Sequence, residues 1–122
     1  MLTLIGGSAA LAGPENAATG KVESIETSIC RLIESSARIE SLPAAFLTRL
    51  IWQESSFRPG AISAAGAQGI AQFMPKTADE RGLANPFDPE EAIPKAAKLL
   101  ADLKQRFGNL GLAAAAYNAG PA

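Results

Sequence analysis

The stretch PAAFLTRLIWQESSFRPG, residues 43–60, decides the fold because it predicts an amphipathic helix with a clear start and stop. Pro43 suits the first turn of a helix, where its missing N–H is not needed. The apolar residues that recur there at helical spacing are Leu47, Leu50 and Ile51. Pro59 and Gly60 break the pattern, so the helix should end within residues 55–57.

Glu54 lies in line with these apolar residues, seven positions after Leu47. Burial of a carboxyl group disfavours its charged form and raises its pKa. A glutamate of this kind at the wall of a cleft can protonate a leaving oxygen as a general acid. The pattern also fits a partly exposed glutamate at a frayed helix end, hydrogen-bonded to Ser55 or Ser56, so both interpretations stay open here.

Other segments also carry helical patterns, so the expected fold class is mostly α-helical. The first covers residues 22–38, and its apolar stripe consists of Val22, Ile25, Ile29, Leu32 and Ile33. Cys30 lies beside that stripe, which favours a small buried residue, and as the only cysteine it excludes an internal disulfide. A short apolar helical turn over residues 70–74, a short helix in PKTADERG with Gly82 as its cap, and a last helix in LGLAAAAYN are also predicted.

Residues 88–91, Asp-Pro-Glu-Glu, give the clearest helix start, with a capping aspartate and a proline in the first turn. The expected buried stripe of this helix is Ala96, Leu99, Leu100, Leu103 and Phe107. Pro94 lies inside the span and should kink or restart the helix, and Gly108 should end it.

Composition limits the possible functions of the 122 residues, a length that fits one domain. The chain has no histidine, which excludes Ser-His-Asp and Cys-His catalysis and disfavours a zinc site, so no metal or cofactor is expected. A net charge of −1 gives no electrostatic case for nucleic acid. No segment reaches the ~20 apolar residues of a transmembrane helix.

The apolar residues at the start of the chain predict a separate leader, residues 1–20, ahead of a domain at 21–122. Ala10-Leu11-Ala12 resembles a signal-peptide cleavage site, but no Lys or Arg precedes Lys21. A signal peptide and a disordered leader both remain open, with residues 14–20 as a linker.

Most of the 12 acidic residues have a simple structural explanation, which leaves Glu54 without an obvious acidic partner. Asp88 and Glu91 begin a helix, and Asp102 lies four residues from both Lys98 and Arg106, as in a solvated ion-pair face.

Three blocks of sequence, in order, make the chain similar to a known family. They are ESSF (54–57), followed by Ser63, then GAQGIAQFMPKTA (66–78) and AAYNAGP (115–121). The chain thereby resembles the lytic transglycosylase SLT domain, which has a goose-type lysozyme-like fold. The resemblance covers about residues 43–121. Since family members continue with further helices after the last block, it implies a domain truncated at its C-terminus.

The resemblance implies cleavage of the β-1,4 bond between N-acetylmuramic acid and N-acetylglucosamine in peptidoglycan. Glu54 matches the single catalytic glutamate, which protonates the glycosidic oxygen and then acts as base on the 6-hydroxyl of the sugar, giving 1,6-anhydromuramic acid. Two alternatives remain, namely a lysozyme-like muramidase that adds water and an inactive peptidoglycan-binding fragment. A monomer in the periplasm or cell envelope, with peptidoglycan glycan strands as its partner, is expected.

The resemblance also implies substrate-binding residues, which are Ser63, Gln72, Met74, Tyr117 and Asn118. Each has a simpler alternative: a loop serine, a glutamine on a short surface helix, a core methionine, a packed tyrosine and a helix-ending asparagine. Ser63 could bond Glu54 or the acetamido group. Gly66 and Gly69 are expected to allow close backbone approach. Trp52 and Phe57 are expected in the core rather than as sugar platforms.

Overall fold

The computed structural model describes residues 24–119, so the leader predicted for residues 1–20 and Val22 lie outside the described part. In chain order the helices of this part are α2 (Ile25–Ile39), α3 (Ala44–Ser55), α4 (Pro75–Glu80), α5 (Pro89–Phe107) and α6 (Leu110–Ala119). The described residues contain isolated β-bridges but no strand. The prediction of a mostly α-helical fold is confirmed.

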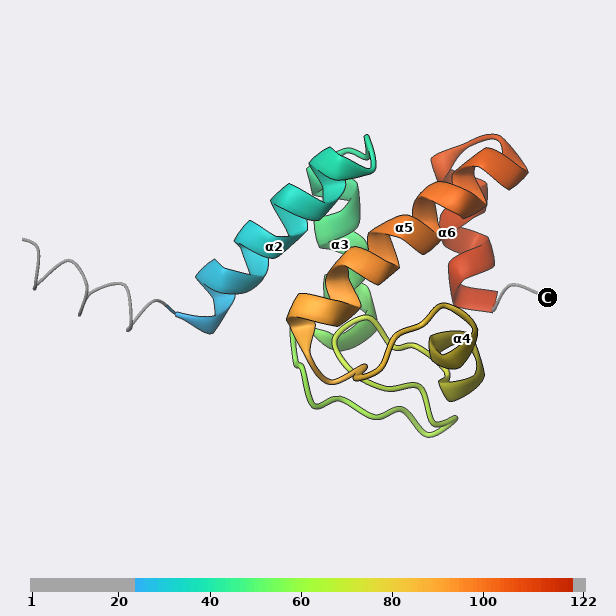
Figure 1. Ribbon diagram of the computed structural model, residues 1–122. Helices are drawn as coiled ribbons and strands as arrows, with labels where there is room; N and C mark the ends of the chain where they lie inside the picture. Colours follow the sequence, from blue (N-terminus) through green and yellow to red (C-terminus); the bar gives the residue numbers. More distant parts are fainter. Residues whose placement is uncertain (1–23, 120–122) are drawn as a thin grey trace, which may run out of the picture.

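Helix α5 is central, because it packs against both α2 and α6, while α2 also packs against α3 (Figure 1). The segment between α3 and α5, which includes α4, gathers at one end of the longer helices (Figure 1). No helix in residues 24–119 is both long enough and apolar enough to cross a membrane.

The core joins the helices to this irregular segment. Its largest fully buried side chains are Ile29, Ile33, Leu47, Ile51, Ile70, Ile93 and Leu100. Ile70 comes from the irregular segment, where a helical turn was predicted over residues 70–74. That prediction is wrong: residues 69–72 form a tight turn closed by Gln68 and Phe73, whose backbones exchange hydrogen bonds of 2.9 and 3.0 Å. The turn carries Ile70 into the helical core.

The start of α5 follows its sequence. The Asp88 side chain accepts a hydrogen bond of 2.9 Å from the Glu90 N–H, as expected of a cap. Pro94 does not restart the helix, which runs without interruption from Pro89 to Phe107. Because proline has no N–H, the carbonyl of Glu90, four residues earlier, lacks its helical hydrogen bond. Glu90 is exposed, so water can bond to this carbonyl instead.

Gly82 ends α4 as predicted. It adopts a φ of +71°, and the next residue, Leu83, donates its N–H to the Ala78 carbonyl at 2.8 Å. These are the features of a glycine-terminated helix that folds back on its own last turn.

Three burial predictions for α2 and α5 are wrong, and two of them concern helix ends. Ile25, the first residue of α2, is 66% exposed, and Phe107, the last residue of α5, is 41% exposed. The third is Cys30, which is exposed because it lies one position, or about 100°, away from the buried Ile29.

The ion pairs of Asp102 also differ from the prediction in one partner. Its carboxylate contacts Lys98 at 3.3 Å, as expected, but its closer partner is Arg81 at 2.9 Å, from the end of α4. Arg106, the expected second partner, instead lies over the Phe107 ring, 5.1 Å from its centre. Arg81 and Lys98 hold the pKa of Asp102 below its usual value.

Candidate functional site

Glu54 is the penultimate residue of α3 and lies at the edge of the buried face of that helix. Leu47, Leu50 and Ile51 are buried, while Glu54 is only partly buried. Burial raises the pKa of the Glu54 carboxyl above its ordinary value, with no cation lowering it. The carboxyl group is therefore more readily protonated than that of a surface glutamate.

The backbone turns sharply after Glu54. Ser56 and Phe57 adopt φ values of 54° and 63°, so two consecutive residues other than glycine lie in the left-handed region. This region is unfavourable for a bulky side chain such as Phe57 and persists only where surrounding contacts hold it. Here the Arg58 backbone N–H and Nε both donate to the Ser55 carbonyl, at 3.2 and 3.0 Å.

Two helices hold the turn at residues 69–72 through consecutive carbonyls. The buried Ser55 of α3 donates its hydroxyl to the Ile70 carbonyl at 2.7 Å. Tyr117 of α6 donates its hydroxyl to the Ala71 carbonyl at 2.8 Å. Since Ser55 adjoins Glu54 in sequence, these two bonds fix the turn beside the end of α3 that carries the carboxyl group.

Tyr117 lies close enough to Glu54 to be affected by its charge. Burial raises the pKa of the Tyr117 hydroxyl strongly, and the Glu54 charge raises it further. The hydroxyl therefore stays protonated at physiological pH. Because its one proton is donated to Ala71, it can only accept a further hydrogen bond. The Tyr117 ring also meets Phe73 edge to face, with centroids 6.5 Å apart.

Gln72 lies in this turn, and Met74 lies two residues beyond it. Gln72 is not on a helix: it has a φ of 57°, and its Nε2 donates to the Gly69 carbonyl at 2.9 Å and the Ala61 carbonyl at 3.2 Å. Both N–H groups are thus used within the loop, and only Oε1 remains to meet a ligand. Met74 precedes α4 and is 42% exposed, so the alternative of a core methionine is wrong.

Ser63 stands apart from this group. Its Oγ accepts a hydrogen bond from the Ala67 N–H at 3.0 Å, and its own N–H donates to the Ala67 carbonyl at 2.9 Å. The suggested bond to Glu54 does not occur among the bonds of the described chain, and Ser63 shapes an exposed loop turn instead.

Asn118 lies in a groove between α3 and α6 of about 120 Å³. The other residues that line it are Phe46, Arg49, Leu50, Gln53 and Ala114. In sequence, Gln53 adjoins Glu54 and Asn118 adjoins Tyr117. The groove therefore lies on the same parts of α3 and α6 that carry Glu54 and Tyr117. No cluster of potential metal ligands occurs within residues 24–119.

Known proteins are similar to this chain in both sequence and fold. The profile of the transglycosylase SLT domain matches residues 31–122. The chain belongs to the transglycosylase SLT domain family. An X-ray structure of an inactive Glu-to-Gln mutant of the lytic transglycosylase Slt from Pseudomonas aeruginosa is similar, with a TM-score of 0.69 and 34% identity. The match covers 75% of this chain and 16% of that one.

Two curated relatives of this SLT domain agree with that assignment. The transglycosylase of Enterobacteria phage PRD1 is 35% identical over 80 residues, which cover 66% of this chain and 30% of the relative. The membrane-bound lytic murein transglycosylase F of Desulfosudis oleivorans is 34% identical over 96 residues, covering 73% and 21%. The SLT domain thus spans less than a third of the length of these relatives.

Sequence reasoning missed one residue that shapes the site, and the partner of another. Ser55 appeared only as a possible partner of Glu54, yet it is one of the two donors that hold the 69–72 turn. Gly69 was expected to allow close approach, but its partner, the Pro86 carbonyl, was not foreseeable from the sequence. Gly66, paired with it in that expectation, has open space around it.

Replacing Tyr117 by phenylalanine should loosen the SLT domain at this turn. The variant keeps the ring contact with Phe73 but leaves the Ala71 carbonyl without its donor, which costs about 1–3 kcal/mol when the group is buried. Urea unfolding should show this loss. Phe87→Tyr, at an exposed ring in the loop before α5, serves as the control and should change stability by less than about 0.5 kcal/mol. Equal stability of Tyr117→Phe and the parent would contradict the role given to this hydroxyl.

Proposed function

We propose that this SLT domain is a lytic transglycosylase that cleaves the β-1,4 bond between N-acetylmuramic acid and N-acetylglucosamine in peptidoglycan. One observation carries the proposal: a single partly buried glutamate, Glu54, whose pKa is raised by burial and which lies beside a turn fixed by two helices. Such a group is suited to act first as an acid and then as a base.

The reaction needs only the substrate and this one carboxyl group. Protonated Glu54 gives its proton to the glycosidic oxygen, and the bond to the anomeric carbon breaks. The carboxylate then removes the proton of the sugar's 6-hydroxyl, whose oxygen attacks the anomeric carbon and closes the 1,6-anhydro ring. Glu54 ends protonated, as it began, and no water is consumed.

The surroundings of Glu54 support this use of one carboxyl group. Glycosidases that use two carboxylates hold them about 5–9.5 Å apart, close enough for each to affect the pKa of the other. Burial is the cause of the raised Glu54 pKa, and no acidic neighbour contributes to it. The substrate's 2-acetamido group would help to stabilise positive charge at the anomeric carbon.

The other residues of the site take supporting roles in this proposal. Gln72 would offer its Oε1 to an acetamido N–H or a hydroxyl, since its N–H groups are used in the loop. Met74 would give an apolar wall. Tyr117 would hold the turn and accept a hydrogen bond, while Asn118 would bind sugar in the adjoining groove. Ser63 would act through the shape of its loop.

The relatives are consistent with a protein that works on the cell wall. Two of them carry the names transglycosylase and membrane-bound lytic murein transglycosylase. We therefore propose that the SLT domain acts as a monomer in the periplasm or cell envelope, where peptidoglycan lies, without a cofactor.

Mass spectrometry of the products tests the proposal directly. Purified sacculi incubated with the chain should release muropeptides with 1,6-anhydro ends, which are lighter by one water than reducing ends. Products with reducing ends would show a muramidase instead. Binding to sacculi without any release would leave only the peptidoglycan-binding alternative.

A further inference from the structure

A second groove lies on the other side of α3 from Glu54. It has a volume of about 390 Å³ and lies between the start of α2 and the residues that follow α3. Trp52 is one of the residues that line it and is 54% exposed, so the expectation of a core tryptophan is wrong. Half-exposure of so large an apolar ring within a concave surface is typical of a binding site.

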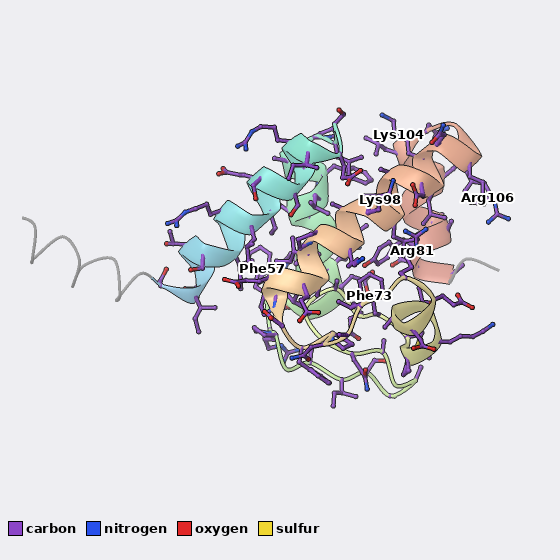
Figure 2. All side chains as sticks on the ribbon, in the orientation of Figure 1. Phe57, Phe73, Arg81, Lys98, Lys104 and Arg106 are labelled. Carbon is purple, nitrogen blue, oxygen red and sulfur yellow. The ribbon has the colours of Figure 1, made fainter. Side chains whose placement is uncertain are left out.

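The aromatic surface of this groove is already in place. The Trp52 and Phe57 rings meet nearly at a right angle, with centroids 5.2 Å apart and an interplanar angle of 79°. Phe57 reaches that position through its unfavourable φ of 63°. Figure 2 shows it on the α2 side of the irregular segment, away from Phe73. A ring held in this way loses little conformational freedom on binding.

The lining of the groove also includes the apolar Ile25 and Pro59, and its remaining residues are polar and carry both charges. Glu26 of α2 contributes a carboxylate, Arg58 a guanidinium and Ser56 a hydroxyl. Arg58 is fixed by the bond from its Nε to the Ser55 carbonyl, which leaves its terminal N–H groups able to donate. The two charges cancel, so the groove has no electrostatic preference for an anion or a cation.

We propose that this groove is an accessory site that binds the pyranose rings of a glycan strand outside the catalytic cleft. A pyranose has an apolar C–H face that fits against an aromatic ring, and a rim of hydroxyl and acetamido groups that fits neutral and paired polar side chains. A protein partner would instead favour an aromatic centre from which charged residues are depleted. The inference rests on the proposed function for the identity of the glycan.

The position of Trp52 separates this site from the cleft. Trp52 and Glu54 are two residues apart on α3, which rotates their side chains by about 200° around the helix. One short sugar chain cannot contact both faces of the helix at once. The accessory site therefore holds a neighbouring stretch or a second strand, and keeps the enzyme on its polymer by adding a second point of attachment.

Trp52 is the only tryptophan of the chain, so intrinsic fluorescence reports on this groove alone. Iodide should quench the free chain strongly. Addition of the β-1,4 trimer of N-acetylglucosamine should shift the emission to shorter wavelength in a saturable way and reduce iodide quenching by about threefold or more, as stacking removes the ring from water. Weak quenching of the free chain would show that the groove is already covered. That result, or emission unchanged by the sugar, would overturn the proposal.

Sedimentation with sacculi gives an independent measure in the Glu54→Gln background, where the glycan is not consumed. Adding Trp52→Ala should weaken binding about tenfold, because the site loses the ring against which a pyranose packs. Adding Phe107→Ala, which removes another exposed ring on α5, should leave binding unchanged. Equal binding of the Trp52→Ala and Phe107→Ala double variants would overturn the accessory site.

The two proposals fail in different ways. If the parent chain releases anhydro products but its Trp52 fluorescence does not respond to the sugar, only the accessory site is overturned. A saturable response of Trp52 without anhydro products would uphold the site and reject the transglycosylase activity.

Discussion

Replacing Glu54 by glutamine should lower the release of anhydromuropeptides from sacculi by about 10²–10⁴-fold, the usual contribution of a general acid or base. The amide has nearly the same shape, but it can neither give a proton to the glycosidic oxygen nor take one from the 6-hydroxyl. Since Glu54 would perform both steps, the loss should lie toward the upper end of that range. Chromatography of the released fragments measures it.

The pH dependence follows from the raised pKa of Glu54. As a general acid it must be protonated, so activity should fall as the pH rises through the raised pKa. Folding stability changes in the same direction. The folded state binds the proton more tightly than the unfolded state, so stability is lost as the pH rises from the ordinary pKa through the raised one.

Glu54→Gln removes the charge and therefore that loss. The midpoint temperature of its thermal unfolding should equal the parent's at about pH 4. At about pH 7 it should be higher than the parent's. A matched control is Glu34→Gln, at an exposed position on α2, which should leave activity unchanged and change stability by less than about 0.5 kcal/mol. Full activity of Glu54→Gln would reject Glu54 as the catalytic acid. Unchanged pH dependence of its unfolding would reject the effect of burial.

The sequence was most informative where local chemistry decides the structure. Apolar spacing in residues 43–60 predicted α3 and the buried Leu47 and Ile51. Asp88 predicted the start of α5, and Gly82 the end of α4. In each case the contacts involved lie within a few residues of one another, so a short window of sequence contains all the partners.

The sequence was least informative where a distant partner decides. Asp102 pairs most closely with Arg81, from a different helix, rather than with the Arg106 four residues away. Helical spacing predicts the side of α5 on which Phe107 lies. It does not predict whether another element covers that residue, and Phe107 is 41% exposed. The turn at residues 69–72 depends on Ser55 and Tyr117, which lie 15 and 46 residues from the carbonyls they bind.

Replacing Gly69 by alanine should be the most damaging change to this part of the fold. Gly69 is buried and has a φ of +83°, where any other L-residue costs about 1–2 kcal/mol. A Cβ atom there would also overlap the Pro86 carbonyl oxygen, which is backbone and cannot swing aside. The variant must displace the segment before α5, or move the turn and with it the Ile70 and Ala71 carbonyls. We expect a loss above about 4 kcal/mol, a large share of the 5–15 kcal/mol that stabilises a domain.

Gly66→Ala separates the two causes of that loss. Gly66 has a φ of +95°, but an added Cβ there would meet nothing within 4 Å, so it carries only the backbone cost of about 1–2 kcal/mol. The midpoint temperature of thermal unfolding should therefore fall by about 4–16 °C for Gly66→Ala and by more than about 16 °C for Gly69→Ala. Equal losses for the two variants would mean that backbone conformation alone explains Gly69. In that case the contact with Pro86 would not hold the turn beside Glu54.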